Sequence, residues 1–176
     1  MAHLVSRTHE IVVDRGRGVT VAALDEAPLE ALLPKTGRLP GVARVEVLTV
    51  GTFFAPGSRR RVHLSDGSTA LEEVLERKSN EAFRYVVWNY TSKAAAAIRY
   101  GVGAFRYFDE AGGRTRIVWT YAFKLDRRKP PGMLGPIGRF LFRRAFMDTL
   151  WADTMTATLE AMKAYVERCT VEDAVL

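Results

Sequence analysis

The sequence predicts an α+β fold in which a curved antiparallel sheet of about six or seven strands packs against one long C-terminal helix. Two-residue alternation of apolar and polar side chains dominates the middle half of the chain, as in half-buried strands. Tight-turn pairs such as Asp66-Gly67 separate the alternating segments. From Arg139 to Cys169 there is no proline or glycine, and apolar residues recur at three- and four-residue steps, which indicates an amphipathic helix.

The chain has the size and composition of one ordinary globular domain. It contains 176 residues, of which 48% are hydrophobic and 26% charged, so it can bury one sizeable core and is short for two. We therefore interpret residues 1–176 as a single domain. The single cysteine, Cys169, has no partner for an internal disulfide, and the N-terminus lacks the apolar run of a signal peptide. The expected location is cytoplasmic.

The first strands of the middle region are predicted between residues 42 and 77. Val42–Val50 alternates with a two-residue period, and Arg59–Ser65 resumes the pattern before the first tight turn. Thr69–Arg77 could also be written as a helix, but the hairpin signal that precedes it favours a strand.

Three further strands are predicted after this segment. Ala82–Tyr90 is rich in aromatic and β-branched residues. Ile98–Phe108 and Arg114–Leu125 are joined through two adjacent glycines, which supply the positive φ of a hairpin turn. Aromatic residues alternate along Arg114–Leu125, so one of its faces is predicted to be buried.

The N-terminal third and the connection after Leu125 carry less regular patterns. Glu10–Val13 and Val19–Ala23 are predicted as strand pieces, and Ala27–Leu33 as a short helix that stops before Pro34. Residues 126–138 include three prolines and three glycines, so no regular structure is expected before about Arg139.

The last helix is predicted to span residues 139–169, roughly 30 residues. Its start is both apolar and basic, because Phe142 and Phe146 stand among Arg139, Arg143 and Arg144. Together with the 127–138 loop, this end could touch an anionic membrane surface or act as a movable lid. The alternative is a loop that simply packs against the domain.

The net charge of +6 raises the question of an anionic partner. Positive residues gather at 59–61, 127–129 and 139–144, but no zinc-finger spacing, ribonucleoprotein signature or clear helix-turn-helix accompanies them. We interpret them as solvated faces and loop edges, and expect no specific nucleic-acid partner. Charges also interrupt the most apolar late stretch, 133–151, so no segment is predicted to span a membrane.

No spacing of residues indicates metal or cofactor chemistry. His3, His9 and His63 occur singly, so no metal site is predicted, and no cofactor is expected. The Gly-Val-Gly motif at 101–103 lies inside a strand pattern and lacks the helix that follows a dinucleotide-binding loop. We interpret it as a bulge or bend in the sheet.

The order of segments between Val42 and Val166 carries a resemblance to a known group of proteins. The segments are GSRRRV at 57–62, LEEVLE at 71–76, FRYVV at 83–87 and GRTRIVW at 113–119, followed by the long last helix. In this order they resemble the polyketide cyclase/dehydrase and lipid-transport superfamily (SRPBCC), which includes START-related and birch-pollen-allergen-like proteins. The first 40 residues depart from the superfamily's usual opening of one strand and two helices.

The resemblance implies a helix-grip fold with an elongated apolar pocket between sheet and helix. It implies no particular substrate, since members bind lipids, sterols, polyketides and plant hormones, and only some are enzymes. We expect the protein to bind or transport a hydrophobic small molecule. One alternative is an enzyme of the aromatic polyketide cyclase/dehydratase kind. Another is a protein-interaction or stress-response module whose core is filled.

Side chains on the predicted buried faces are the candidate ligand-binding residues. They are Tyr85, Val87, Phe105, Tyr107, Trp119, Tyr121 and Phe123 from the sheet, and Trp151, Met155 and Leu159 from the helix. Taken one at a time, such residues are more often ordinary core. As a set, the tyrosines and tryptophans need partners for their polar atoms, which a ligand or water would supply.

Polar groups that could orient a ligand are Asn89, Thr120, Thr158 and Asp148. Asp148 is the candidate catalytic residue, because it lies on or beside the apolar stripe of the last helix. An inward carboxylate with a raised pKa could act as a general base. The alternative, which we favour, is a salt bridge with Arg144 four residues earlier on the helix.

Overall fold

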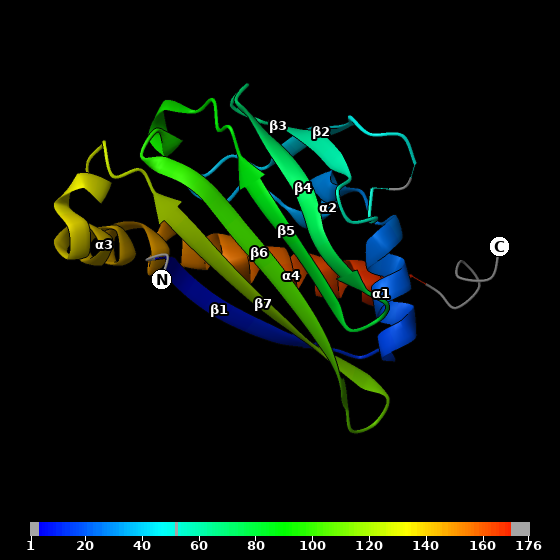
Figure 1. Cartoon of the computed structure of the whole chain (residues 1–176). Coiled ribbons are helices and arrows are strands. Elements are labelled where there is room, and N and C mark those ends of the chain that lie inside the picture. The colour runs from blue at the N-terminus through cyan, green and yellow to red at the C-terminus, as the bar shows by residue number, and fades with distance from the viewer. Residues whose placement is uncertain (1–3, 52, 170–176) are drawn as a thin grey trace.

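The computed structural model describes residues 4–51 and 53–169 (Figure 1). No helix in these two ranges is both long and apolar enough to cross a bilayer. The strands are β1 (Val5–Val13), β2 (Val42–Val47), β3 (Arg59–Leu64), β4 (Thr69–Lys78), β5 (Ala82–Trp88), β6 (Ile98–Glu110) and β7 (Arg114–Leu125). The α-helices are α1 (Arg17–Glu26), α2 (Leu29–Leu32), α3 (Gly135–Phe142) and α4 (Leu150–Arg168). Short helical turns are η1 (Lys93–Ala95), η2 (Gly132–Leu134) and η3 (Arg143–Met147).

The strands form one antiparallel sheet in the order β1-β7-β6-β5-β4-β3-β2. Figure 1 shows α4 lying across one face of this curved sheet, and α1 and α2 pack beside α4. The apolar sides of the strands and of α4 face each other because each must bury its apolar stripe against another element. The predicted curved sheet with a long C-terminal helix is confirmed.

All six strands predicted between Val42 and Leu125 are present, although β2 ends earlier than expected. The ambiguous segment β4 is a strand, and its burial alternates, with Ala70, Glu72 and Val74 buried. The predicted turns are also present, since Gly67 has φ 81° and Gly112 has φ 78°. Alternation together with turn residues was therefore sufficient to identify the six strands from β2 to β7.

The N-terminal segment differs from the prediction. Val19–Ala23 belongs to helix α1 and not to a strand. Its β-branched residues favour extended structure locally, but Thr20, Val21 and Leu24 bury one face of the helix, and that burial outweighs propensity. β1 starts at Val5, and the short helix expected near Ala27–Leu33 is α2. The chain therefore opens with a strand and two helices, so the expected departure from that opening is wrong.

The predicted continuous helix over residues 139–169 is also wrong. A π-helical turn follows α3, and α4 starts only at Leu150. Thr149 has non-helical φ −125° and ψ −98°. At the break, the Asp148 carboxylate accepts a hydrogen bond from Arg7 on β1 at 2.7 Å. Because neither proline nor glycine is present at this point, we attribute the break to tertiary contacts.

The loop before α3 is shorter than expected. Regular structure begins at Gly132 with η2 and continues into α3, well before Arg139. Pro136 lies in the first turn of α3, where its missing N–H and fixed φ are compatible with a helix. Counting prolines and glycines therefore overestimated the irregular segment.

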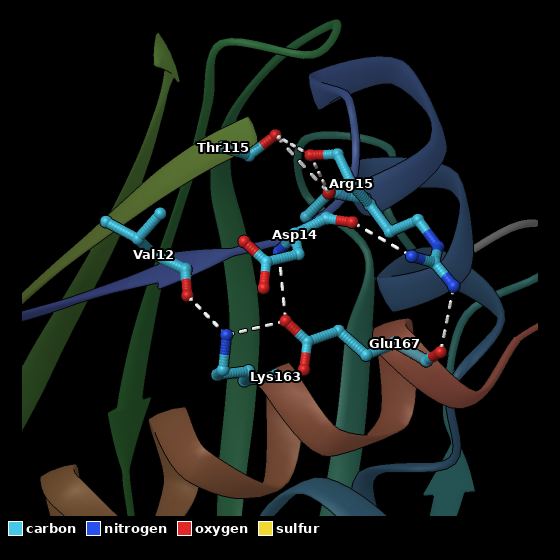
Figure 2. Close-up of polar contacts among 7 residues, drawn as sticks. Val12, Asp14, Arg15, Thr115, Lys163 and Glu167 are labelled. Atoms are coloured by element: carbon cyan, nitrogen blue, oxygen red, sulfur yellow. Dashed lines mark hydrogen bonds and ion pairs between the residues drawn. The ribbon is translucent and has the colours of Figure 1, made fainter. Parts of the chain in front are cut away.

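A polar cluster fastens the C-terminal end of α4 to the turn after β1 (Figure 2). Lys163 Nζ donates to the carbonyl of Val12 at 2.8 Å and pairs with Glu167 at 2.5 Å. Glu167 in turn accepts the backbone N–H of Asp14 at 2.9 Å, and Arg15 donates to the Glu167 carbonyl at 3.0 Å. The hydrogen bond from the Asp14 N–H is the main reason that the pKa of Glu167 lies below its usual value. These bonds hold α4 in place across the sheet.

Candidate ligand-binding site

A cavity of about 310 Å³ lies between the inner face of the sheet and α4. Its size is at the lower end of the range for small-molecule sites. The strands β3 to β7 contribute Arg60, Val62, Glu72, Arg77, Phe83, Tyr85, Val87, Phe105, Tyr107, Trp119, Tyr121 and Phe123. The helical side contributes Leu24, Asp25, Leu29, Leu32, Phe146, Trp151, Thr154, Thr158 and Met162.

Eight of the ten side chains predicted from the sequence line this cavity. They are Tyr85, Val87, Phe105, Tyr107, Trp119, Tyr121, Phe123 and Trp151. Met155 and Leu159 are not among the lining residues and lie in the core, at 0% and 2% exposure, so the prediction is wrong for these two. On α4 the cavity is instead lined by Trp151, Thr154, Thr158 and Met162, which recur at three- and four-residue steps.

Aromatic rings form a nearly continuous wall. Phe105 stacks on Trp119 with ring centroids 5.1 Å apart, and Trp151 from α4 lies 4.7 Å from Tyr121. Tyr85 stacks on Phe83 at 5.4 Å. Offset and edge-to-face contacts of this kind each contribute about 0.5–1.5 kcal/mol beyond area burial and restrict the rings to one arrangement. These contacts hold the aromatic rings of the cavity wall in fixed positions relative to one another.

Gly101 and Gly103 permit two of these rings to lie on the backbone of β6. A Cβ atom at Gly103 would overlap the Tyr85 ring, and one at Gly101 would overlap the Tyr121 ring. Both glycines sit in regular pairing with β5 and β7, and the register shift of β6 lies between Ile98 and Tyr100. The interpretation of the motif as a bulge is therefore wrong; the glycines make room for tyrosine side chains.

A buried ion pair, Arg60 with Glu72, lies on the cavity wall. Arg60 Nη2 donates to the Glu72 carboxylate at 2.8 Å, and the two side chains are 14% and 5% exposed. The Arg60 guanidinium also lies 3.9 Å from the centre of the Phe53 ring. The interpretation of residues 59–61 as solvated is therefore wrong for Arg60. The two-residue alternation along β3 could have indicated this, since Arg60 shares its strand face with the apolar residues Val62 and Leu64.

A second ion pair, Arg77 with Asp25, borders the cavity where α1 approaches the sheet. A β-bulge between Val74 and Glu76 shifts the phase of β4. Side chains alternate along a regular strand, so without the bulge Arg77 would lie on the outer face of the sheet together with Leu75. With the bulge, Arg77 lies on the inner face and lines the cavity. Burial raises the pKa of Asp25, although the nearby Arg77 opposes the rise.

The protonation of the cavity residues follows from burial. Burial raises the pKa of Tyr85, Tyr107 and Tyr121 above the usual value, so their hydroxyls remain protonated and can donate. Burial also raises the pKa of Glu72, although the adjacent Arg60 guanidinium lowers it. The wall thus offers several neutral donors and one carboxylate that holds a proton more readily than an exposed one.

Several buried donors at the cavity lack a partner within the described part of the chain. They include Arg60 Nε, Trp151 Nε1 and Thr158 Oγ1. A buried donor without a partner costs about 1–3 kcal/mol, so such groups are seldom left unpaired without a reason.

The other polar residues predicted to orient a ligand lie elsewhere. Thr120 bonds to Thr8 on the exposed side of the sheet at 2.8 Å, and Asn89 is exposed with φ 54°. Asp148 is not among the cavity-lining residues. Its carboxylate pairs with Arg7 at 2.7 Å and lies 3.9 Å from Arg143, so the expected salt bridge with Arg144 is replaced by these two contacts.

Asp148→Asn is expected to leave binding in the cavity unchanged. The Asp148 carboxylate pairs with Arg7 and so joins β1 to the helix break. Because the pair is partly exposed, the substitution should lower the free energy of unfolding by about 1 kcal/mol. Chemical denaturation and ligand titration of the variant would measure both quantities. Loss of function in a folded Asp148→Asn variant would restore the general-base hypothesis.

Residues suited to hold a metal do not converge in the described ranges. No group of three or more His, Cys, Asp or Glu side chains comes together within residues 4–51 and 53–169. His9 is held between Arg7 at 2.7 Å and Thr156 at 3.2 Å on the β1–α4 side of the molecule. The polar groups of the cavity are hydrogen-bond donors and ion pairs, which suit an organic ligand.

The sequence matches the profile of the family described as polyketide cyclase / dehydrase and lipid transport over residues 30–167. The match covers most of the chain, and the protein therefore belongs to this family. A comparison with curated proteins returned no significant match.

Solved structures share the fold at low sequence identity. The Zhui aromatase/cyclase from Streptomyces sp. R1128 has a TM-score of 0.68 at 18% identity, over 94% of this chain and 95% of that chain. TTHA0849 from Thermus thermophilus has a TM-score of 0.62 at 18% identity, over 92% and 96% of the two chains. Ara h 8.0201 has a TM-score of 0.60 at 15% identity, over 93% and 98%. These likenesses confirm the expected helix-grip fold.

Proposed function

We propose that the protein binds a mainly apolar small molecule with at least one hydrogen-bond acceptor. The observation that carries the proposal is the mainly apolar and aromatic wall of the cavity, in which Trp151 Nε1 and Thr158 Oγ1 are buried donors without a partner among the described residues. The aromatic side chains that line the cavity, among them Phe105 and Trp119, favour an apolar ligand, because such sites are lined mainly by hydrophobic and aromatic residues. Membership of a family that includes lipid-transport proteins supports the same class of ligand.

Carriage or sequestration is the function that we favour within this class. The tyrosine hydroxyls are held protonated by burial, which suits them to donate hydrogen bonds and not to accept protons. In each of the two ion pairs that border the cavity, Arg60–Glu72 and Arg77–Asp25, the positive and negative charges neutralise each other before a ligand enters. Such a site can select and hold a molecule without transforming it.

A second candidate function is a cyclase or dehydratase activity, and Glu72 is the observation that favours it. Burial raises the pKa of Glu72, so this carboxyl group holds a proton more readily than an exposed one, which is the direction of shift expected for a general acid or base. This role replaces the one considered for Asp148. Turnover of a bound compound by the wild-type protein, lost in Glu72→Gln with binding retained, would favour the enzyme over the carrier.

The binding proposal predicts that a ligand of this class raises thermal stability. A panel of fatty acids, sterols and aromatic polyketides can be screened for a shift of the unfolding midpoint. A compound at a hundred times its dissociation constant should stabilise the native state by about 2.7 kcal/mol. If no member of the panel shifts the midpoint, the carrier hypothesis loses its support.

Thr158→Val tests the role of the unpartnered hydroxyl. The isosteric change removes a buried hydroxyl that has no partner in the part of the chain that the structure describes, so stability without ligand should be unchanged or slightly higher. Affinity for the stabilising compound should fall about tenfold, corresponding to one lost hydrogen bond. Thr156→Val is the matched control, since Thr156 is exposed on the same helix and outside the cavity. Equal affinities in the two variants would contradict the assigned role.

A further inference from the structure

The segment from η2 through α3 exposes an unusual number of large apolar side chains. Five of the exposed large hydrophobic residues of the described chain fall within nine positions: Met133, Leu134, Ile137, Phe140 and Leu141. Ile137, Phe140 and Met133 are the most exposed of these, at 67%, 62% and 58%. On the opposite side of α3, Gly138 and Phe142 are buried against the protein. We call this set of five side chains the α3 patch.

All of the net charge of the chain lies around the α3 patch. Residues 127–147 contain six Lys and Arg residues and no Asp or Glu, and the remaining residues hold 20 of each sign. The six are Arg127, Arg128, Lys129, Arg139, Arg143 and Arg144. A hollow beside the patch is lined by Lys124, Arg127 and Arg139 together with Met133. Apolar tips and single-sign charge therefore occupy one surface.

The position of this surface leaves it free to meet a large partner. Figure 1 shows α3 at one end of the molecule, away from α1 and outside the sheet. The segment is also continuous with the cavity, because Phe142 packs on Phe123 at 5.9 Å and Phe146 lines the cavity. A partner bound at the α3 patch would thus lie next to one wall of the ligand site.

Charge decides between the possible occupants. A second copy of this chain would bring two surfaces of charge +6 together, and like charges oppose such contact. An anionic bilayer matches both features of the surface. Its phosphate groups can pair with the Lys and Arg side chains, while the apolar side chains enter the boundary between headgroups and acyl chains. A short helix with apolar side chains outward and basic residues at its edges has the pattern of an interfacial helix.

We propose that the α3 patch docks the protein on anionic lipid surfaces. Ile137 and Phe140 insert below the headgroups, and the surrounding Arg and Lys side chains bind lipid phosphate. Docking places the Phe146 wall of the cavity close to the membrane, from which an apolar ligand could enter. The proposal does not depend on the cavity ligand, because it rests only on the surface of α3 and its neighbours.

Vesicle flotation tests the proposal with the full-length protein and no added ligand. The probes are vesicles of pure phosphatidylcholine and vesicles of phosphatidylcholine mixed equally with phosphatidylglycerol. The wild-type protein should float only with the anionic vesicles, and added salt should weaken the binding. Ile137→Ser/Phe140→Ser should reduce partitioning about tenfold or more, since it removes the two most exposed apolar tips of the patch. The control Val47→Ser/Val50→Ser alters two exposed apolar residues at and after the end of β2, distant in sequence from the α3 patch, and it should bind as the wild type does.

A charge-matched pair of variants locates the electrostatic part of the interaction. Arg128→Gln/Lys129→Gln/Arg144→Gln should weaken binding by roughly a hundredfold, as three cations near an anionic surface imply. The control, Arg84→Gln/Arg99→Gln/Arg106→Gln, has the same net charge but changes exposed residues of β5 and β6, and it should retain binding. All variants alter exposed side chains, and unchanged unfolding midpoints would verify that they fold.

Three results would overturn the proposal. The first is failure of the wild-type protein to float with anionic vesicles, as expected if the patch binds an acidic protein instead. The second is equal loss of binding in the two charge-matched variants, which would indicate attraction by net charge alone. The third is a dimer in sedimentation that Ile137→Ser/Phe140→Ser abolishes, which would show that a second copy covers the patch.

Discussion

Arg60→Met is expected to lower the free energy of unfolding by about 3–5 kcal/mol at neutral pH. The substitution leaves the Glu72 carboxylate buried without its partner, and an uncompensated buried charge is far more costly than the loss of an exposed pair. Glu72→Leu should lower the free energy of unfolding by a similar amount, because it leaves the buried Arg60 guanidinium without its carboxylate partner. Denaturant unfolding of the two variants and of the double variant Arg60→Met/Glu72→Leu measures the effect.

The double variant should be close to the wild type in stability or above it. Replacing both charges by apolar side chains removes the desolvation cost along with the attraction, so the two single effects are not additive. Additive losses would show that the pair is well solvated and would contradict the assignment of Arg60 to a buried wall.

The penalty in Arg60→Met should shrink in acid, whereas the penalty in Glu72→Leu should not. Burial already raises the pKa of Glu72 above its ordinary value of 4.5, and removal of Arg60 raises it further. At pH values between 4.5, the ordinary pKa, and the raised pKa of Glu72 in the folded variant, the folded state binds more protons than the unfolded state. Stability is therefore regained as pH falls through the folded pKa. Arg60 stays charged throughout, which is why Glu72→Leu lacks this dependence.

Gly103→Ala is expected to destabilise the protein by about 3 kcal/mol, a large effect for one methyl group. Alanine in a strand would normally gain about 0.5–1 kcal/mol over glycine. At this position the added Cβ overlaps the Tyr85 ring, which is held between Phe83 and Phe105, and overpacking outweighs the gain. Thermal and denaturant unfolding of the variant would measure the loss.

Gly18→Ala is the matched control for Gly103→Ala. Gly18 lies in α1, where the nearest atom to a new Cβ is 4.0 Å away, so this substitution should raise stability by about 0.5–1 kcal/mol. A second variant, Gly103→Ala/Tyr85→Leu, frees space for the methyl group and should recover part of the loss. If Gly103→Ala is as stable as Gly18→Ala, the glycines do not determine the position of the tyrosine rings.

The sheet could be predicted from the sequence because its signals are local. Alternation and turn residues identify the six strands from β2 to β7, and the alternating aromatic residues of β7 identify the buried face without knowledge of the partner strands. The same phase places Tyr85, Trp119 and Tyr121 on the cavity wall. Local patterns therefore sufficed for the aromatic residues that the sheet contributes, but not for α4, where Met155 and Leu159 lie outside the cavity wall.

The charged part of the site could not be predicted, since it depends on non-local packing. Arg60 has the inward phase, but an arginine in a basic run is usually solvated, and its partner Glu72 lies on the next strand. Arg77 reaches the interior only because a bulge shifts β4, and the sequence has no local signal for that bulge. The break after Asp148 likewise depends on Arg7, distant in sequence.

Native mass spectrometry of the protein as purified from its source organism tests the central claim most directly. The cavity should retain an apolar compound at a stoichiometry of one per chain, and denaturation should release it for identification. Such a result would establish the site as a small-molecule binding site and name the chemical class of its ligand. A protein that is empty as purified, and that gains no thermal stability from any apolar ring compound, would contradict the claim.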